Sequence, residues 1–166
     1  MSDQPVAILV PGRIHPRVLE RLKETFEIVA VPMGPPHDID PGLRDRIRGV
    51  AISGVLDNGW IDRLPNLEIV SNFGVGYDGV DTAKAVEHDI IVTHTPDVLN
   101  DEVADTTIAL LLNTLREYPR AENYLREGRW KSEGPYPLTP LSLRGRHVGI
   151  LGLGRIGIEI ARRLEP

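Results

Sequence analysis

The stretch VGILGLGRIG, residues 148–157, decides which kind of fold the chain encodes. It starts as an apolar segment, passes through the spacing G-x-G-x-x-G at Gly152, Gly154 and Gly157, and continues into an amphipathic stretch over residues 158–164. Gly152 permits a tight turn, Gly154 lets the backbone approach a pyrophosphate, and Gly157 lets the helix pack close to the strand. A strand, this loop and a helix in that order indicate a dinucleotide-binding βα unit, because the start of the helix offers free N–H groups to phosphate.

A tight structural turn or a site for another nucleotide-like ligand is the alternative interpretation, since this glycine spacing is not specific to dinucleotides. The acidic residue that would hold the adenine ribose is expected about 20 residues after the loop, which lies past residue 166. The sequence therefore fits both dinucleotides, and the cofactor expected is NADP or NAD.

The residues before the glycine loop predict a separate α/β domain. Short apolar stretches alternate with helical ones, and turn residues divide them. The expected strands are residues 6–10, 27–31, 50–52, 67–72 and 90–93, with helices from residue 16 and over 43–48, 60–64 and 80–87. Parallel neighbours need a crossover connection, which helices usually supply. We therefore expect a flavodoxin-like parallel sheet over residues 1–98, covered on both faces.

The pattern changes at Asn100, which has the character of an N-cap and is followed by two acidic residues. Apolar residues then recur at helical spacing, which predicts a long buried helix. Pro119 should kink or restart this helix, and Gly128 should end it.

The remaining residues complete the second part of the chain. Residues 128–146 contain several prolines and aromatic residues, and we expect an extended excursion there. Residues 147–151 are predicted to be a strand that enters the glycine loop. Residues 99–166 are thus expected to form a linking helix and the first βα unit of a Rossmann NAD(P)-binding domain, truncated at residue 166.

Composition excludes several classes of function. The net charge is −5, and there is no lysine or arginine run that would suit nucleic acid or an anionic membrane. The chain has no cysteine, which excludes disulfides, thiolate metal sites and cysteine nucleophiles. The longest apolar run, residues 108–112, is too short to span a bilayer, and no signal peptide is evident. We expect a cytoplasmic protein whose partner is a small molecule.

A second glycine loop follows the strand expected at residues 67–72. Its sequence is NFGVGYD, residues 72–78, and it lies where open α/β sheets bind their ligands, at the carboxyl end of a strand. Successive N–H groups without bulky side chains can hold an anion. A simple strand-to-helix turn that needs two glycines is the alternative.

Four segments in this order resemble the D-isomer-specific 2-hydroxyacid dehydrogenases, particularly the glyoxylate/hydroxypyruvate reductase branch. They are EIVSNFGVGYDGVD (68–81), IVTHTPDVLNDEVADTTIALLL (91–112), REGRW (126–130) and GILGLGRIG (149–157). The match covers the N-terminal half of that family. The resemblance implies that residues 1–98 are the substrate domain and that residues 99–166 begin the cofactor domain. It also implies reduction of a small 2-keto acid, of the glyoxylate or hydroxypyruvate type, to the D-2-hydroxy acid with NAD(P)H.

The resemblance assigns roles to several residues of the first domain and of the linking helix. Val75 and Gly76 would offer backbone N–H groups to the substrate carboxylate, and Val75 would also approach the nicotinamide. Leu56 would line the same pocket. Thr107 occupies a position that faces the cofactor, although it also fits an ordinary core threonine.

At the glycine loop of residues 152–157, Gly154, Arg155 and Ile156 match the residues that touch the pyrophosphate, between the structural glycines Gly152 and Gly157. His94 stands where relatives often carry asparagine, and we interpret it as a hinge-turn residue.

The family's catalytic arginine, glutamate and histidine belong to the later part of the cofactor domain, so no catalytic residue and no metal ligand is expected in this segment, which alone should be inactive. In the intact protein, an arm over residues 126–143 would hold a homodimer. A non-catalytic, cofactor-sensing scaffold of the same fold and a stand-alone binding module are the alternatives.

Overall fold

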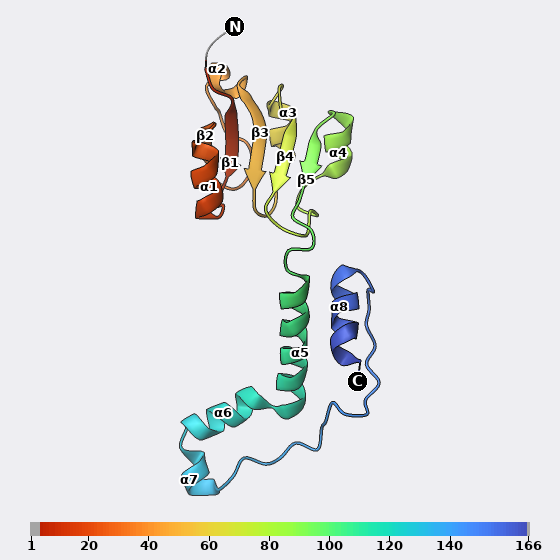
Figure 1. Cartoon of the computed structure of the whole chain (residues 1–166). Coiled ribbons are helices and arrows are strands. Elements are labelled where there is room, and N and C mark those ends of the chain that lie inside the picture. Colours follow the sequence, from red (N-terminus) through yellow and green to blue (C-terminus); the bar gives the residue numbers. More distant parts are fainter. Residues whose placement is uncertain (1–3, 166) are drawn as a thin grey trace. The chain divides into compact units, whose positions relative to one another are not determined.

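The computed structural model describes residues 4–165, which divide after Val98 into two compact units (Figure 1). The first unit contains the sheet, and the second unit contains helices and an extended segment. No helix among the described residues is both long and apolar enough to cross a bilayer.

The first unit is built on one parallel sheet. Its strands are β1 (Ala7–Pro11), β2 (Glu27–Val31), β3 (Ile47–Ile52), β4 (Ile69–Asn72) and β5 (Ile91–Thr93). They pair in the order β2-β1-β3-β4-β5, and every pair is parallel. This order is that of flavodoxin-like sheets, so the predicted fold class is confirmed.

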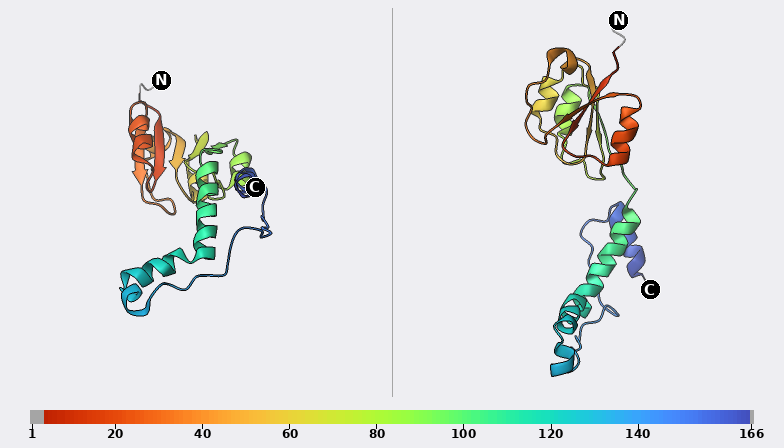
Figure 2. Two further views of the ribbon diagram at one scale, coloured as in Figure 1. Left: turned by 60° about the horizontal axis from the view of Figure 1, so that its bottom comes forward. Right: turned by 90° about the vertical axis from the view of Figure 1, so that its left-hand side faces the viewer.

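Helices cover both faces of this sheet. α1 (Pro16–Lys23) lies on one face, and α2 (Pro41–Arg44), α3 (Gly59–Arg63) and α4 (Thr82–Glu87) lie on the other (Figure 2). Proline at the first position starts both α1 and α2, where its lack of an N–H group costs nothing. Aspartates cap α2 and α4 by accepting hydrogen bonds of 3.0 Å from backbone N–H groups in the first turn.

Alternation along the strands divides the core into two clusters. Ala7 and Leu9 of β1 face the larger cluster, which includes Trp60 of α3, and these three side chains are at most 1% exposed. Ile8 and Val10 point to the α1 face and join a smaller cluster. Each large apolar side chain buried in this way stabilises the fold by about 1.5–3 kcal/mol.

The helix expected over residues 43–48 is wrong in its second half. α2 ends at Arg44, and β3 already begins at Ile47. Ile47 is fully buried and pairs with Ala7 of β1. Sheet pairing on both sides of β3 therefore overrides the weak helical spacing of this short stretch.

The second unit consists of four helices and a long extended segment. α5 (Asn100–Arg116) ends at Glu117, which has a left-handed φ of 55°, and α6 (Tyr118–Arg126) restarts next to Pro119, as expected. Leu99, rather than Asn100, is the N-cap residue of α5. Gly128, with a φ of 76°, separates α6 from α7 (Arg129–Glu133). The expectation of a purely extended excursion over residues 128–146 is therefore wrong at α7, which an Arg129–Glu133 pair of 2.8 Å supports.

Two further expectations for this unit are wrong. Residues 147–151 are not a strand, since the described residues of the unit provide no second strand with which they could pair. Leu151 is fully exposed as a result. The long helix α5 is also mostly open to solvent: only Ala104 and Leu115 are buried, and Leu110 is 61% exposed.

One ionic cluster joins α8 (Arg155–Leu164) to α5 within the second unit. The guanidinium of Arg163 donates to Asp101 at 2.9 Å and to Asp105 at 2.5 Å, and it also contacts Glu159 of its own helix. These carboxylates, that of Asp101 first, raise the pKa of Arg163. A planar guanidinium suits this arrangement because it can bond several carboxylates at once.

The cluster predicts that Arg163→Ala loosens α8 from α5. Amide hydrogen exchange over residues 155–164 should accelerate, because both links to α5 are lost. Arg162→Ala is the matched control. Among the described residues, Arg162 is paired only with Glu159, which lies on the same helix. Equal exchange in the two variants would contradict a role of Arg163 in holding the helices together.

Candidate functional site

The loops at the carboxyl ends of the strands gather at one edge of the sheet, because all its strands are parallel. The loops after β3 and β4 touch directly. The N–H of Leu56 donates to the carbonyl of Gly79 at 2.8 Å. A Cβ at Gly79 would lie 2.2 Å from the carbonyl oxygen of Gly54, so only glycine permits this approach.

The loop over residues 73–78, here called the β4 loop, has an unusual pattern of hydrogen bonds. Three successive carbonyls in it accept hydrogen bonds from outside the loop. Gly74 accepts from the N–H of Thr95 at 2.9 Å, Val75 lies 2.8 Å from Nδ1 of His94, and Gly76 accepts from Nδ2 of Asn72 at 2.7 Å. The carbonyl side of the loop is therefore satisfied by groups from β4 and from the segment after β5.

Three successive N–H groups of the same loop are left available. Within residues 4–165, the backbone N–H groups of Val75, Gly76 and Tyr77 have no hydrogen-bond partner. Gly76 and Tyr77 are exposed, and Val75 is half-buried. A row of free N–H groups at a strand end can bind an anion such as a carboxylate.

The end of the β4 loop is fixed by Asp81, the N-cap of α4. Its carboxylate accepts from the N–H of Lys84 at 3.0 Å and from Nδ2 of Asn58 at 2.8 Å. The backbone hydrogen bond from Lys84 lowers the pKa of Asp81. The residues on both sides of the β4 loop thus have defined hydrogen-bond partners.

The side chain of Leu56 lies in the core of the first unit. It is 3% exposed and belongs to the larger apolar cluster. Any contact with a substrate would involve the few exposed atoms of this residue, and its role in the pocket stays a prediction.

The glycine loop of the second unit has the shape that its sequence predicts, although no strand precedes it. Gly152 has a left-handed φ of 95°. A Cβ at Gly157 would lie 2.2 Å from the carbonyl oxygen of Gly152, whereas a Cβ at Gly154 would meet nothing within 4 Å. Gly157 thus lets α8 pack against the turn, and Gly154 leaves an open approach. Both properties fit a pyrophosphate at the start of α8.

The other residues predicted to face the cofactor are Thr107, Arg155 and Ile156. The hydroxyl of Thr107 donates to the carbonyl of Val103 at 2.8 Å, so its oxygen can still accept a hydrogen bond. Arg155 is exposed in the first turn of α8, and Ile156 beside it is half-buried. Their contacts with a cofactor stay predictions.

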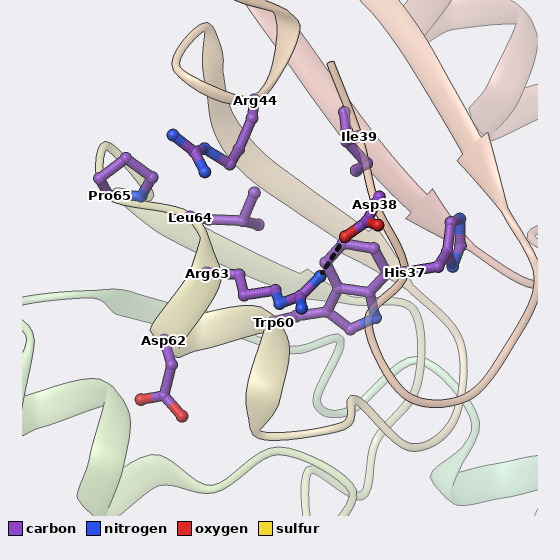
Figure 3. Close-up of a pocket in the computed structure, with 9 residues that line it drawn as sticks. All are labelled: His37, Asp38, Ile39, Arg44, Trp60, Asp62, Arg63, Leu64 and Pro65. Carbon is purple, nitrogen blue, oxygen red and sulfur yellow. Dashed lines mark hydrogen bonds and ion pairs between the residues drawn. The ribbon is translucent and has the colours of Figure 1, made fainter. Parts of the chain in front are cut away.

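A hollow of about 460 Å³ lies between α3 and the loop before α2 in the first unit (Figure 3). Its charged side chains are already paired: Arg63 with Asp38 at 3.3 Å, Asp62 with Lys84 at 2.6 Å, and Arg44 with Asp45. The indole N–H of Trp60 donates to the carbonyl of Gly34. We assign no function to this hollow, because its charged side chains already have ionic partners.

Sequence reasoning located the β4 loop but missed the residues that hold it. Asn72, His94 and Thr95 follow from strand register, since Ser71 of β4 pairs with Thr93 of β5. The residues just after this pair must lie side by side. That signal is present in the sequence once the order of the strands is known.

Comparison with protein families gives one match to most of the chain. Residues 7–155 match the model of the D-isomer specific 2-hydroxyacid dehydrogenase catalytic domain. A glyoxylate/hydroxypyruvate reductase A of Arabidopsis thaliana is 48% identical over 124 residues, which are 74% of this chain and 39% of the relative. A glyoxylate reductase of Thermococcus kodakarensis is 38% identical, and the match covers 94% of this chain and 49% of the relative.

Solved structures give the same result. An NADPH-dependent glyoxylate/hydroxypyruvate reductase of Sinorhizobium meliloti, crystallised with NADP and malonate, is 58% identical with a TM-score of 0.90. The match covers 98% of this chain and 50% of that one. This chain therefore spans half or less of the length of these relatives.

The packing of Gly157 predicts a strong effect of Gly157→Ala. The added methyl group must displace the Gly152 carbonyl, so the variant should lower the free energy of unfolding of the second unit by about 1–3 kcal/mol. Gly149→Ala is the control, because a Cβ there meets nothing within 4 Å. Chemical denaturation followed by circular dichroism measures both, and equal stability of the two variants would show that α8 does not need this close contact.

Proposed function

The chain belongs to the D-isomer-specific 2-hydroxyacid dehydrogenase family, and we propose that the whole protein reduces a small 2-keto acid, such as glyoxylate or hydroxypyruvate, with NADPH or NADH. The observation that carries this proposal is the row of free N–H groups at Val75, Gly76 and Tyr77, because a 2-keto acid must be held by its carboxylate. The product would be the D-2-hydroxy acid. The solved relative that contains NADP and malonate supports both the proposed cofactor and the proposed binding of a carboxylate.

In the substrate domain, which we assign to residues 1–98, the carboxylate would accept hydrogen bonds from the N–H groups of Val75 and Gly76. Leu56 would lie near the same pocket. Backbone donors suit this task because they are fixed by the fold and do not titrate. Hydrogen bonds to a charged acceptor are also stronger than those between neutral groups.

In the cofactor domain, whose beginning we assign to residues 99–166, the glycine loop and the start of α8 would hold the pyrophosphate. Gly154, Arg155 and Ile156 would contact it, while Gly152 and Gly157 give the loop its shape. Val75 and Thr107 would approach the nicotinamide part. The bound cofactor supplies the hydride, and this chain's residues bind and orient it.

We infer that residues 1–166 bind but do not catalyse. In the family, an arginine polarises the keto group, and a histidine, oriented by a glutamate, protonates the alkoxide that forms. None of the three matches a position of this sequence. A placed proton donor contributes about two to four orders of magnitude in rate, so the segment alone should be inactive.

We further propose that the whole protein is a homodimer in the cytoplasm and that the arm over residues 126–143 contributes to the dimer contact. The base of the arm is fixed within its own unit, since the hydroxyl of Tyr136 donates to the carboxylate of Glu117 at 2.6 Å, which raises the pKa of Tyr136. Its outer apolar side chains are open, with Trp130 51% and Leu138 88% exposed. Such side chains favour a protein partner, and a second copy is the simplest one.

The first prediction concerns activity. Residues 1–166 should show no reduction of hydroxypyruvate, while a protein of the full length of the relatives should oxidise NADPH or NADH in its presence. Cofactor absorbance measures both under the same conditions. Turnover by the segment near the rate of the longer protein would refute our assignment of catalysis, and an inactive longer protein that still binds cofactor would favour the non-catalytic scaffold.

The second prediction concerns the arm. In the longer protein, Trp130→Glu combined with Leu138→Glu should shift sedimentation from dimer towards monomer at micromolar concentration, because buried carboxylates oppose association. Val86→Glu is the matched control, since Val86 is 74% exposed on the first unit, outside the arm. A monomeric parent, or a double variant that stays dimeric, would contradict the role of the arm.

A further inference from the structure

We propose that His94 and Asn72 are positioning residues, which turn three successive peptides of the β4 loop so that the N–H groups of Val75, Gly76 and Tyr77 form one anion cradle. The inference rests on the proposed function for its substrate, a carboxylate, and extends it to the residues that build the site. It also adds the N–H of Tyr77 as a third donor.

The argument starts from the geometry of the peptide bond. The described chain contains no cis peptide, and in a trans peptide the N–H points away from the carbonyl of the same unit. The carbonyl of Gly74 is held by Thr95, so the N–H of Val75 points the opposite way. The carbonyls of Val75 and Gly76, held by His94 and Asn72, direct the next two N–H groups likewise.

An ordinary turn does not have this arrangement. In a turn, the N–H groups usually donate to carbonyls three or four residues earlier in the same loop. Here the carbonyls are satisfied by groups from β4 and from the segment after β5, and the three N–H groups find no acceptor among residues 4–165. In these three peptides the acceptors are thus occupied and the donors are available.

The side chain of His94 is well suited to this role. A carbonyl oxygen only accepts, so Nδ1 of His94 must carry a hydrogen. Both the neutral Nδ1–H tautomer and the imidazolium satisfy this requirement. The ring of Tyr77 packs edge-on against the imidazole, with centroids 5.0 Å apart, and limits its rotation.

Asn72 is held as firmly. It is 4% exposed, the one buried polar residue among those described, and Nδ2 lies 3.4 Å from the position that a Cβ at Gly74 would take. Glycine at 74 therefore leaves room for the amide to reach the carbonyl of Gly76. A buried amide that donates to a loop carbonyl fixes the peptide because leaving it unpaired is unfavourable.

Loss of the His94 donor has a specific consequence. The peptide between Val75 and Gly76 can then rotate, and its carbonyl oxygen can face the anion in place of the N–H. Binding of a carboxylate should weaken more than the fold does, because the free carbonyl repels it. Asparagine at position 94 should restore the bond, since its Nδ2 lies at the same side-chain position as the Nδ1 of histidine.

The test in the longer protein compares His94→Leu, His94→Asn and, as a matched control, His88→Leu at the exposed end of α4. We expect His94→Leu to raise the KM for glyoxylate about tenfold with little change in the KM for the cofactor, and His94→Asn to recover most of this loss. Unchanged kinetics in His94→Leu would overturn the proposal. So would equal losses for substrate and cofactor, which indicate a general structural role.

The test on residues 1–166 does not depend on catalysis. Oxamate, an unreactive analogue of a 2-keto acid, is titrated while the ¹H–¹⁵N signals of the backbone are followed. The N–H signals of Val75, Gly76 and Tyr77 should move together, and the apparent Kd should rise in His94→Leu but not in His88→Leu. If the longer protein fails to reduce any 2-keto acid while these signals still move, the proposed function fails and the cradle stands. If the enzyme is active but none of the three signals moves, the cradle is overturned. If only the Tyr77 signal stays still, the role of Tyr77 as third donor is overturned.

Discussion

Parallel pairing of β3, β4 and β5 is the constraint on which the rest of the first unit depends. It brings the carboxyl ends of these strands to one edge, and its register sets which residues meet there. Ser71 pairs with Thr93, so the residues that follow each of them, Asn72 and His94, lie next to each other. A shift of this register by one residue would turn every side chain of β5 to the other face of the sheet. The hydrogen bonds of the β4 loop are therefore a consequence of sheet register.

The same constraint explains which expectations about the fold could be made from the sequence. The strands β1, β2, β4 and β5 are short β-branched or aliphatic runs bounded by turn residues, and they were located to within one or two residues. Their parallel order follows from the alternation with helices. The start of β3 was missed because Ile47 and Arg48 also fit a helical pattern, and only the neighbouring strands on both sides decide between the two.

The second unit shows the opposite case. The sequence of residues 147–151 has the character of a strand, but a strand exists only through its hydrogen bonds to a neighbour, and the described residues of this unit offer none. The apolar stripe of α5 likewise predicts burial that two packed helices alone do not provide. Local sequence thus predicts what an element can become, whereas its partners determine whether it forms. The helix α8 differs, because its hydrogen bonds are internal.

Both glycine loops can present N–H groups to an anion, yet they do so by different physical means. At the start of α8 the first N–H groups have no carbonyl four residues earlier within the helix, as at any helix start. In the β4 loop the donors are free because other residues occupy the carbonyls of the same peptides. The first arrangement can be recognised from a short motif, as the spacing of Gly152, Gly154 and Gly157 shows. The second needs three groups, one from β4 and two from the segment after β5, and no motif within the loop encodes it. A search for anion-binding sequence motifs would therefore not find Asn72 and His94, although the β4 loop depends on them for its shape.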